Sequence, residues 1–322
     1  MEQKEFLEVK NLKMFYSTLR GDVKAVDNVT FTLNERDGLG LVGESGCGKT
    51  STILTILKLL PRNSRIKSGE INFNQENLLK MPESRFRKEI RWKKISTVFQ
   101  GAMNALHPTM NIGNQIAEAI LLHEDVNKKE ATERAKKLLD LVGIGASRAD
   151  RYPHELSGGM KQRAIIAMSI ACNPELVIFD EPTTALDVIV AAQVLGLVKE
   201  LQHKLGLSII LVTHDLSMVA EVCNKIAVMY AGKIVEMGDI NRIYKETLHP
   251  YSEKLIMAFP SILGSKRELP SISGFPPNLL EPPSGCRFHP RCSYTMDICR
   301  KKEPTLEDVG SDHLVACHLV RG

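Results

Sequence analysis

Short apolar runs alternate with longer amphipathic segments along this chain, and the pattern predicts a mixed α/β protein. The apolar runs with the length and composition of buried strands are 39–42, 95–99, 176–179 and 208–212. The longer segments with apolar residues at helical spacing are 50–60, 112–122 and 128–142. Buried strands separated by helices are typical of a parallel sheet with helices on its faces.

The same pattern divides the chain into regions. Residues 1–42 predict the strands and turns of a small antiparallel β-subdomain, residues 101–172 are helical, and strands and helices alternate again over 176–238. Beyond these regions proline and glycine become more frequent and the periodicity weakens. We therefore predict a main domain over 1–260 and a small C-terminal extension over 261–322.

A glycine-rich loop joins the strand at 39–42 to the helix that follows it. Residues 43–50 fit the pattern G-x-x-x-x-G-K-[ST] at every fixed position, which disfavours an ordinary glycine-rich turn. Glycines let backbone N–H groups surround phosphate oxygens, and the helix start adds further N–H groups. We expect Lys49 to reach the β- and γ-phosphates of a nucleoside triphosphate and Thr50 to bind Mg²⁺. The predicted nucleotide-binding residues of the loop are Gly43, Ser45, Gly46, Cys47, Gly48, Lys49, Thr50 and Ser51.

Two carboxylates end the apolar run at 176–179. Asp180 and Glu181 stand where ligands bind in an open parallel sheet, at the carboxyl end of a strand. A surface acidic pair is the alternative interpretation, and the nearby phosphate loop makes it the weaker one. We expect Asp180 to bind Mg²⁺ and Glu181 to act as general base toward an attacking water.

A second glycine motif at 156–163, Leu-Ser-Gly-Gly-Met-Lys-Gln-Arg, resembles the signature of ABC-type ATPases. Other motifs of that family follow in its order: Gln100 resembles the Q-loop glutamine, 184–187 the D-loop, and His214 the switch histidine. The family often has serine where Thr184 stands. Tyr16 is similar to the aromatic residue that stacks on adenine, although Phe15 is adjacent. The resemblance covers about residues 5–260 and implies a P-loop NTPase of the ABC ATPase type, with a helical subdomain that carries the signature.

In this family two ATPase domains pair head to tail, so the signature of one domain closes on the ATP of the other. The resemblance implies that Ser157, Gly158 and Gly159 contact the partner's nucleotide and that Asp187 lies at the dimer interface. It also implies that Gln100 binds Mg²⁺ and senses the membrane partner. His214 would contact the γ-phosphate.

Composition and charge add limits to this picture. The chain has 322 residues, a net charge of +4 and 43% apolar residues, which is ordinary for a globular protein. The basic stretch at 85–94 lacks interleaved stacking aromatics, so we interpret it as a solvated helix face and expect no nucleic-acid partner. No apolar run approaches the ~18 residues that span a bilayer, and the first residues do not resemble a signal peptide. We therefore expect a soluble, cytosolic chain, and if it drives transport, separate membrane subunits must form the pathway.

Four of the seven cysteines gather near the C-terminal end, with the spacing C-x5-C-x6-C-x17-C: Cys286, Cys292, Cys299 and Cys317. Stable disulfides are disfavoured in the cytosol, so the cluster predicts a metal site that holds a region without its own core. Sulfur ligands suit zinc or an iron–sulfur cluster. The gaps differ from the C-x2-C pairing that is usual for structural zinc, and free or disulfide-bonded cysteines are the remaining alternative.

Three segments resemble the oligopeptide/dipeptide-importer branch of the ABC ATPases: 99–108, 249–252 and 283–292. Within the first, Gly101-Ala102 and His107 depart from the usual family residues, which puts the contacts with membrane subunits in doubt. Members of this branch can carry a 4Fe–4S cluster on four such cysteines, so the resemblance favours that cluster here, with zinc as the alternative.

The branch implies an ATP-hydrolysing subunit of a membrane importer of dipeptides or oligopeptides. It implies two integral membrane permease subunits, a second homologous ATPase subunit that forms a heterodimer or homodimer, and indirectly an extracytoplasmic binding protein. The protein would then be peripheral and lie at the cytoplasmic face of the cell membrane. Nickel and oligosaccharides are alternative cargoes within the branch. A soluble ABC ATPase acting on ribosomes or DNA is the alternative outside it, but such proteins usually carry two ATPase cores on one chain.

Overall fold

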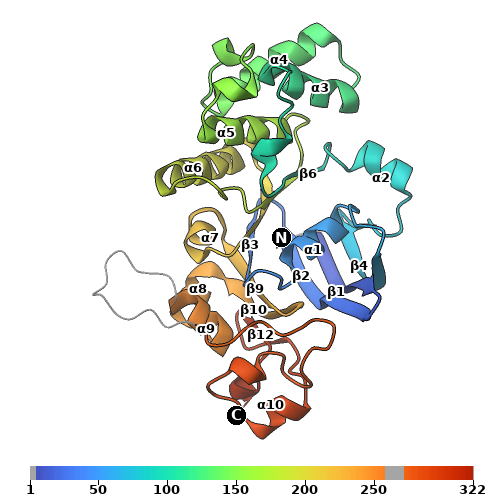
Figure 1. The fold of residues 1–322 in the computed structure, drawn as a ribbon, viewed down its shortest axis with the longest axis vertical. Helices are drawn as coiled ribbons and strands as arrows, with labels where there is room; N and C mark the ends of the chain where they lie inside the picture. Colours follow the sequence, from blue (N-terminus) through green and yellow to red (C-terminus); the bar gives the residue numbers. More distant parts are fainter. Residues whose placement is uncertain (1–4, 258–271, 322) are drawn as a thin grey trace. The chain divides into compact units, whose positions relative to one another are not determined.

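The computed structural model describes residues 5–257 and 272–321. The chain forms two compact units: unit one comprises Met1–Lys80 with Val212–Gly322, and unit two comprises Met81–Leu211. Strand β8 (Ser208–Thr213) includes residues of both units. Figure 1 shows the helices and strands of the chain. The predicted boundary between the main domain and the extension, at 260–261, lies outside the described residues.

Unit one contains an antiparallel sheet in the order β2-β1-β4-β5. Its strands are β1 (Glu5–Thr18), β2 (Gly21–Asn34), β4 (Ser64–Phe73) and β5 (Glu76–Asn77). In the centre of the sheet, Val9 lies opposite Phe31 on β2 and Ile71 on β4. All three side chains are buried, so they belong to the buried face of the sheet.

The phosphate loop begins at a second set of strands in unit one, in the order β11-β12-β10-β9-β3. These strands are β3 (Gly38–Val42), β9 (Lys225–Tyr230), β10 (Lys233–Asp239), β11 (Glu307–Asp308) and β12 (Leu314–Val315). Strands β3 and β9 pair in parallel, whereas β10 pairs antiparallel with both β9 and β12. The C-terminal part of the chain therefore extends this sheet by two short strands, which the sequence pattern did not predict.

The α-helices of unit one are α1 (Lys49–Ile56), α7 (Leu216–Val222), α8 (Ile240–Lys245), α9 (Pro250–Met257) and α10 (Asp297–Lys301). Short 3₁₀ helices occupy His289–Arg291 and His318–Arg321. Helix α1 is shorter than the predicted helix over 50–60. It ends at Ile56 because Lys58 adopts a left-handed conformation with φ 53°. The amide of Leu59 then bonds the carbonyl of Leu54, which closes the helix.

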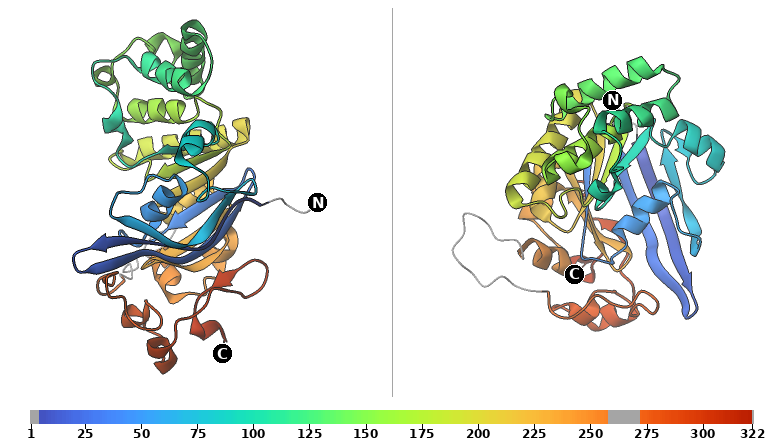
Figure 2. Two further views of the ribbon diagram at one scale, coloured as in Figure 1. Left: turned by 90° about the vertical axis from the view of Figure 1, so that its right-hand side faces the viewer. Right: turned by 45° about the horizontal axis from the view of Figure 1, so that its top comes forward.

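Unit two is mainly helical, and Figure 2 shows its helices over residues 112–169 gathered together. Its α-helices are α2 (Glu83–Glu89), α3 (Ile112–His123), α4 (Lys128–Leu141), α5 (Gly158–Ser169) and α6 (Val188–Leu205). Its short 3₁₀ helices are Ala102–Ala105, Ala146–Arg148 and Pro153–Glu155, and its parallel strand pair is β6 (Ile95–Val98) and β7 (Leu176–Asp180). The predicted helices at 112–122 and 128–142 are confirmed. Asn111 and Asn127 begin them by accepting the amides of Asn114 and Glu130.

Across residues 5–257 and 272–321, the structure contains no helix with the length and apolar character needed to cross a membrane.

Candidate functional site

The phosphate loop is built from a buried strand, two constrained glycines and the start of α1. Every residue of β3 is buried, which fixes the point where the loop begins. Gly48 caps α1 with φ 107°, and a Cβ added there would lie 2.1 Å from the carbonyl oxygen of Ala25. A Cβ on Gly43 would lie 2.2 Å from the carbonyl oxygen of Met229. Both positions therefore require glycine because the conformation and the space each exclude a side chain.

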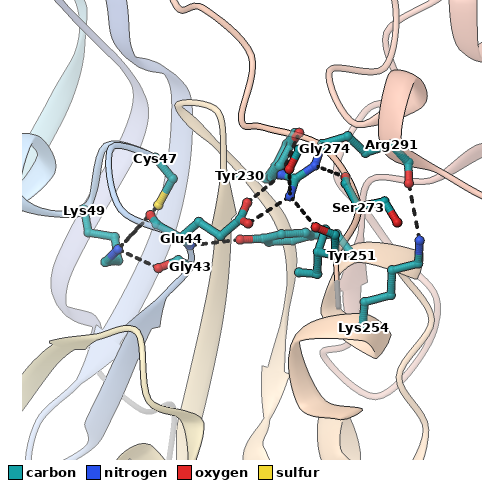
Figure 3. Close-up of polar contacts among 11 residues, drawn as sticks. Gly43, Glu44, Cys47, Lys49, Tyr230, Tyr251, Lys254, Ser273, Gly274 and Arg291 are labelled. Atoms are coloured by element: carbon teal, nitrogen blue, oxygen red, sulfur yellow. Dashed lines mark hydrogen bonds and ion pairs between the residues drawn. The ribbon is translucent and has the colours of Figure 1, made fainter. Parts of the chain in front are cut away.

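Lys49 is buried inside the loop and bonds the loop backbone. Its Nζ donates hydrogen bonds to the carbonyl oxygens of Gly43 at 2.6 Å and Glu44 at 3.0 Å (Figure 3). The Sγ of Cys47 lies 3.7 Å from the same Nζ. Burial raises the pKa of Cys47 although Lys49 opposes the shift, so this thiol is neutral at pH 7. Three predicted nucleotide-binding residues of the loop are exposed: Ser45, Gly46 and Thr50.

Tyr16 lies beside the phosphate-loop helix. Its hydroxyl is 3.0 Å from the Oγ of Ser51, which is on the first turn of α1. The neighbouring ring of Phe15 instead packs under the ammonium group of Lys67, whose Nζ is 5.9 Å from the ring centroid. Tyr16 is thus an aromatic residue that contacts the helix following the phosphate loop. Its stacking on adenine stays a prediction.

In unit two, the strand pair β6 and β7 brings three predicted catalytic and metal-binding residues to one edge. Asp180 is buried at the end of β7, and Glu181 follows it with φ 47°. The amide of Gln100, two residues beyond β6, donates from Nε2 to Glu181 Oε2 at 3.0 Å. Thr184 Oγ1 donates to the same oxygen at 3.1 Å. Thr184 is not among the predicted site residues, although a hydroxyl three residues after a carboxylate in a turn could have indicated this hydrogen bond.

The signature motif and the D-loop each begin a helix of unit two, and these two helix starts are in contact. Ser157 caps α5 by accepting the amide of Met160 at 3.3 Å, and Asp187 caps α6 by accepting the amide of Val190 at 2.9 Å. A Cβ on Gly159 would lie 2.6 Å from Val190 Cγ1. Gly158 faces Leu186 with more space, since its added Cβ would be 3.5 Å away. The structure thus places the predicted signature residues beside the predicted interface residue.

His214 follows β8 and is exposed on unit one. The next residue, Asp215, begins helix α7 by accepting the amide of Ser217 at 2.8 Å, and its own amide bonds Thr213 Oγ1 at 3.0 Å. These bonds fix the backbone on the C-terminal side of the histidine. Its contact with a γ-phosphate stays a prediction.

The prediction of an iron–sulfur cluster or zinc on the four C-terminal cysteines is wrong. In the described part of the chain, which includes all four cysteines, no group of three or more His, Cys, Asp or Glu side chains is arranged to hold a metal ion. Burial, with a contribution from neighbouring thiols, raises the pKa of Cys286 to about 11. Burial also raises the pKa of Cys317. Without a bound metal ion, both thiols are therefore protonated at pH 7. The count and spacing of the cysteines did not distinguish ligands from small side chains that pack in a compact segment.

The structure adds two contacts to the phosphate loop that the sequence analysis missed. Arg291 forms a bidentate ion pair with Glu44, with Nη1–Oε2 and Nη2–Oε1 distances of 2.6 Å and 2.9 Å (Figure 3). The hydroxyl of Tyr251 accepts the amide of Glu44 at 2.9 Å. Both residues lie in the segments that resemble the peptide-importer branch, which was the only signal for them in the sequence.

Two families match this chain. Residues 26–184 match the ABC transporter family, and residues 235–299 match the oligopeptide/dipeptide transporter C-terminal region. Solved structures support the fold. The cassette MJ0796, bound to ADP and Pi in a post-hydrolysis state, is 26% identical with a TM-score of 0.64, and the match covers 73% of this chain and 99% of that one. The cbiO1 subunit of Clostridium perfringens is 25% identical with a TM-score of 0.66, over 76% and 92% of the two chains.

Curated relatives match along almost the whole length. The oligopeptide transport ATP-binding protein OppD of Bacillus subtilis is 45% identical over 98% of this chain and 88% of the relative. OppD of Escherichia coli is 44% identical over 97% and 92%. The dipeptide transport ATP-binding protein DppD of Escherichia coli is 41% identical over 97% and 96%. The chain therefore belongs to the ABC transporter ATPases, in the branch of oligopeptide and dipeptide transport ATP-binding proteins.

Proposed function

We propose that this chain is the ATP-hydrolysing subunit of a membrane importer that takes up dipeptides or oligopeptides. One observation carries the proposal. The same chain combines the phosphate loop and signature of an ABC ATPase with a match to the oligopeptide/dipeptide transporter C-terminal region over residues 235–299. Relatives named for oligopeptide and dipeptide transport align with 97% of this chain, which includes both matched regions.

The phosphate loop holds the ATP phosphates in this proposal. The backbone amides of the loop and the start of α1 face the phosphate oxygens, while Lys49 exchanges its loop carbonyls for the β- and γ-phosphates. The antiparallel sheet of unit one forms a subdomain that carries Tyr16 to the adenine. The residues assigned to ATP are Tyr16, Gly43, Ser45, Gly46, Cys47, Gly48, Lys49, Thr50 and Ser51.

Three side chains provide the oxygen ligands that Mg²⁺ prefers. Thr50 is exposed at the first turn of α1, Asp180 is buried at the end of β7, and Gln100 follows β6. A hydroxyl, a carboxylate and an amide oxygen form a hard donor set that fits magnesium. When bound, the ion neutralises charge that develops on the phosphates.

Glu181 acts as the general base that takes a proton from the attacking water. Gln100 and Thr184 both donate to its Oε2, so two hydrogen bonds orient the carboxylate before water is activated. His214 contacts the γ-phosphate as the nucleotide is cleaved. Gln100 and His214, the other two predicted catalytic residues, position the reacting groups and do not transfer protons.

The surface formed by the starts of α5 and α6 binds a second, homologous ATPase subunit. Ser157, Gly158 and Gly159 offer a helix N-terminus to the ATP of that subunit, and Asp187 lies at the interface. We propose a heterodimer that works with two permease subunits at the cytoplasmic face of the membrane. An extracytoplasmic binding protein would deliver the peptide to the permeases.

The test is reconstitution of the chain with its second ATPase subunit and permeases in proteoliposomes. Glu181→Gln should lower ATP hydrolysis by about 10²- to 10⁴-fold, the range of a general base, and should stop uptake of a labelled dipeptide and tetrapeptide. Binding of ATP should be retained, because the amide keeps the shape of the carboxylate.

The matched control is Glu175→Gln, the same change at the opposite end of β7, where the side chain is 41% exposed. It should leave hydrolysis and uptake unchanged. Hydrolysis at the wild-type rate by the Glu181 variant would refute the general-base role. Rapid ATP hydrolysis by the wild-type complex without uptake of either peptide would refute the cargo.

A further inference from the structure

Glu44 is an acidic residue of the phosphate loop, and the residue that pairs with its charge is distant in the sequence. The guanidinium of Arg291 forms a fork with both carboxylate oxygens, at 2.6 Å and 2.9 Å, across 247 residues of sequence. The side chain of Arg291 is 5% exposed and that of Glu44 is 27% exposed. A bidentate pair that is shielded from water is among the strong charged contacts in proteins.

Arg291 is itself held in place by the segment around residues 272–274. Its Nε donates to the carbonyl oxygen of Ser273 at 2.9 Å, and its Nη2 lies 3.2 Å from the carbonyl oxygens of Ile272 and Gly274. Its guanidinium also lies over the ring of Tyr230, 5.8 Å from the centroid. The fork is therefore oriented by its surroundings as well as by Glu44, as Figure 3 shows.

Tyr251 holds the backbone of the same loop residue. Its hydroxyl accepts the amide of Glu44 at 2.9 Å. The ring is fully buried, with its centroid 4.6 Å from that of Tyr230 and 5.4 Å from that of Phe288. Phe288 belongs to the C-terminal segment, defined here as residues 272–321. The aromatic cluster thus links α9 and the C-terminal segment to the phosphate loop.

Glu44 is consequently fixed at three points. Tyr251 accepts its amide, Lys49 donates to its carbonyl oxygen at 3.0 Å, and Arg291 pairs with its carboxylate. A loop held in one conformation loses less conformational entropy when it binds a ligand. The pairing also has an electrostatic effect, because a carboxylate without its guanidinium would repel the phosphates of ATP.

We propose that Arg291 is a positioning residue for ATP binding, and that it makes the affinity of the phosphate loop depend on the C-terminal segment. Arg291 acts through Glu44 and needs no contact with the nucleotide. The inference rests on the proposed role of the loop in holding ATP.

The test uses the full chain and titrates it with β,γ-imido-ATP and Mg²⁺. Arg291→Met should raise the Kd by about tenfold, a typical size for coupling between two linked sites. The matched control is Arg287→Met, which removes another buried arginine of the C-terminal segment. Arg287 pairs with Asp27 and donates to the carbonyl oxygen of Ala231, whereas Arg291 contacts Glu44 of the phosphate loop directly, so the loss of Arg287 should raise the Kd much less than the loss of Arg291.

Second-site variants separate the charge effect from a general loss of structure. Glu44→Gln removes the carboxylate that needs neutralising, so Glu44→Gln with Arg291→Met should recover most of the lost affinity. Arg291→Lys should give an intermediate Kd because an ammonium group keeps the charge but cannot form the fork. A thermal unfolding midpoint for each variant shows whether the chain is folded during the titration.

The outcomes distinguish this inference from the proposed function. Unchanged binding by Lys49→Ala would overturn the assignment of the loop to ATP. If Lys49→Ala fails to bind while Arg291→Met binds like the wild type, only the positioning role of Arg291 is overturned. Equal loss of affinity in the Arg291 and Arg287 variants would also overturn it, because the effect would then be general to the segment.

Discussion

At the scale of single residues, Glu236 shows how a charged side chain can be part of the core. It lies on β10 between apolar neighbours and is fully buried. Its carboxylate accepts the amides of Leu248 at 2.8 Å and His249 at 3.2 Å, and His313 Nε2 lies 2.8 Å from Oε1. The sequence pattern predicts alternating strands and helices over 176–238, but it does not predict these partners, because they are 12, 13 and 77 residues away.

We predict that Glu236→Gln destabilises the protein by about 1 to 3 kcal/mol, the cost of leaving buried donors without a suitable acceptor. The NH₂ group of the glutamine would face a hydrogen-bond donor that, in the wild type, bonds a carboxylate oxygen of Glu236. The measurement is the thermal unfolding midpoint, with Glu246→Gln as control because that side chain is 67% exposed. Equal midpoints for both variants would show that the three hydrogen bonds contribute nothing to stability.

At the scale of elements, the sequence predicts the strands and helices of the site well and their ends less well. The apolar run at 176–179 is strand β7, and the helix over 112–122 is α3. Helix α1 ends early because Lys58 turns left-handed, a conformation that periodicity does not reveal. Strand β12, Leu314–Val315, is too short to produce a pattern, and its pairing with β10 is a long-range contact. For the same reason, the residues of the phosphate loop are predicted from the sequence, but its contacts with Tyr251 and Arg291 are not.

The contact between α5 and α6 supports a prediction about the two signature glycines. Gly159→Ala should destabilise unit two by about 1 to 3 kcal/mol, because its Cβ would press on Val190 at 2.6 Å and overpacking has that cost. Gly158→Ala should instead stabilise unit two by about 0.4 to 1 kcal/mol. The added Cβ fits in the folded state, so the main effect is a lower conformational entropy of the unfolded chain.

Urea unfolding of the full chain, followed by far-UV circular dichroism, measures both changes. The two substitutions are chemically identical and adjacent, so each serves as the control for the other. Stabilisation by both would mean that the start of α6 moves away without cost and that the packing of these two helices is not tight.

At the scale of the whole molecule, charged pairs attach the C-terminal segment to the rest of unit one. Arg287 pairs with Asp27 on β2, Arg291 pairs with Glu44, and Lys233 lies 2.6 Å from Glu303. This network, with the aromatic cluster and strand β12, explains how a segment with little regular structure is held without a metal. Charge pairing between distant residues cannot be read from composition, so the sequence predicted a ligand set among the cysteines instead.

The Asp27 pair makes this attachment sensitive to acid. Burial opposes ionisation of Asp27, but the charges of Lys233, Arg287 and Lys13 outweigh it, so the pKa of Asp27 lies below its ordinary value. A carboxyl with a lowered pKa in the folded state stabilises that state above its unfolded pKa of about 3.9 and loses this contribution as the pH falls through the folded pKa. Asp27→Asn should therefore be less stable than the wild type at pH 7, and the difference should shrink below about pH 4. Thermal unfolding midpoints at pH 7 and at lower pH measure this, with the exposed Asp125→Asn as control. A difference between Asp27→Asn and the wild type that persists unchanged in acid would mean that packing around residue 27, rather than its charge, attaches the segment.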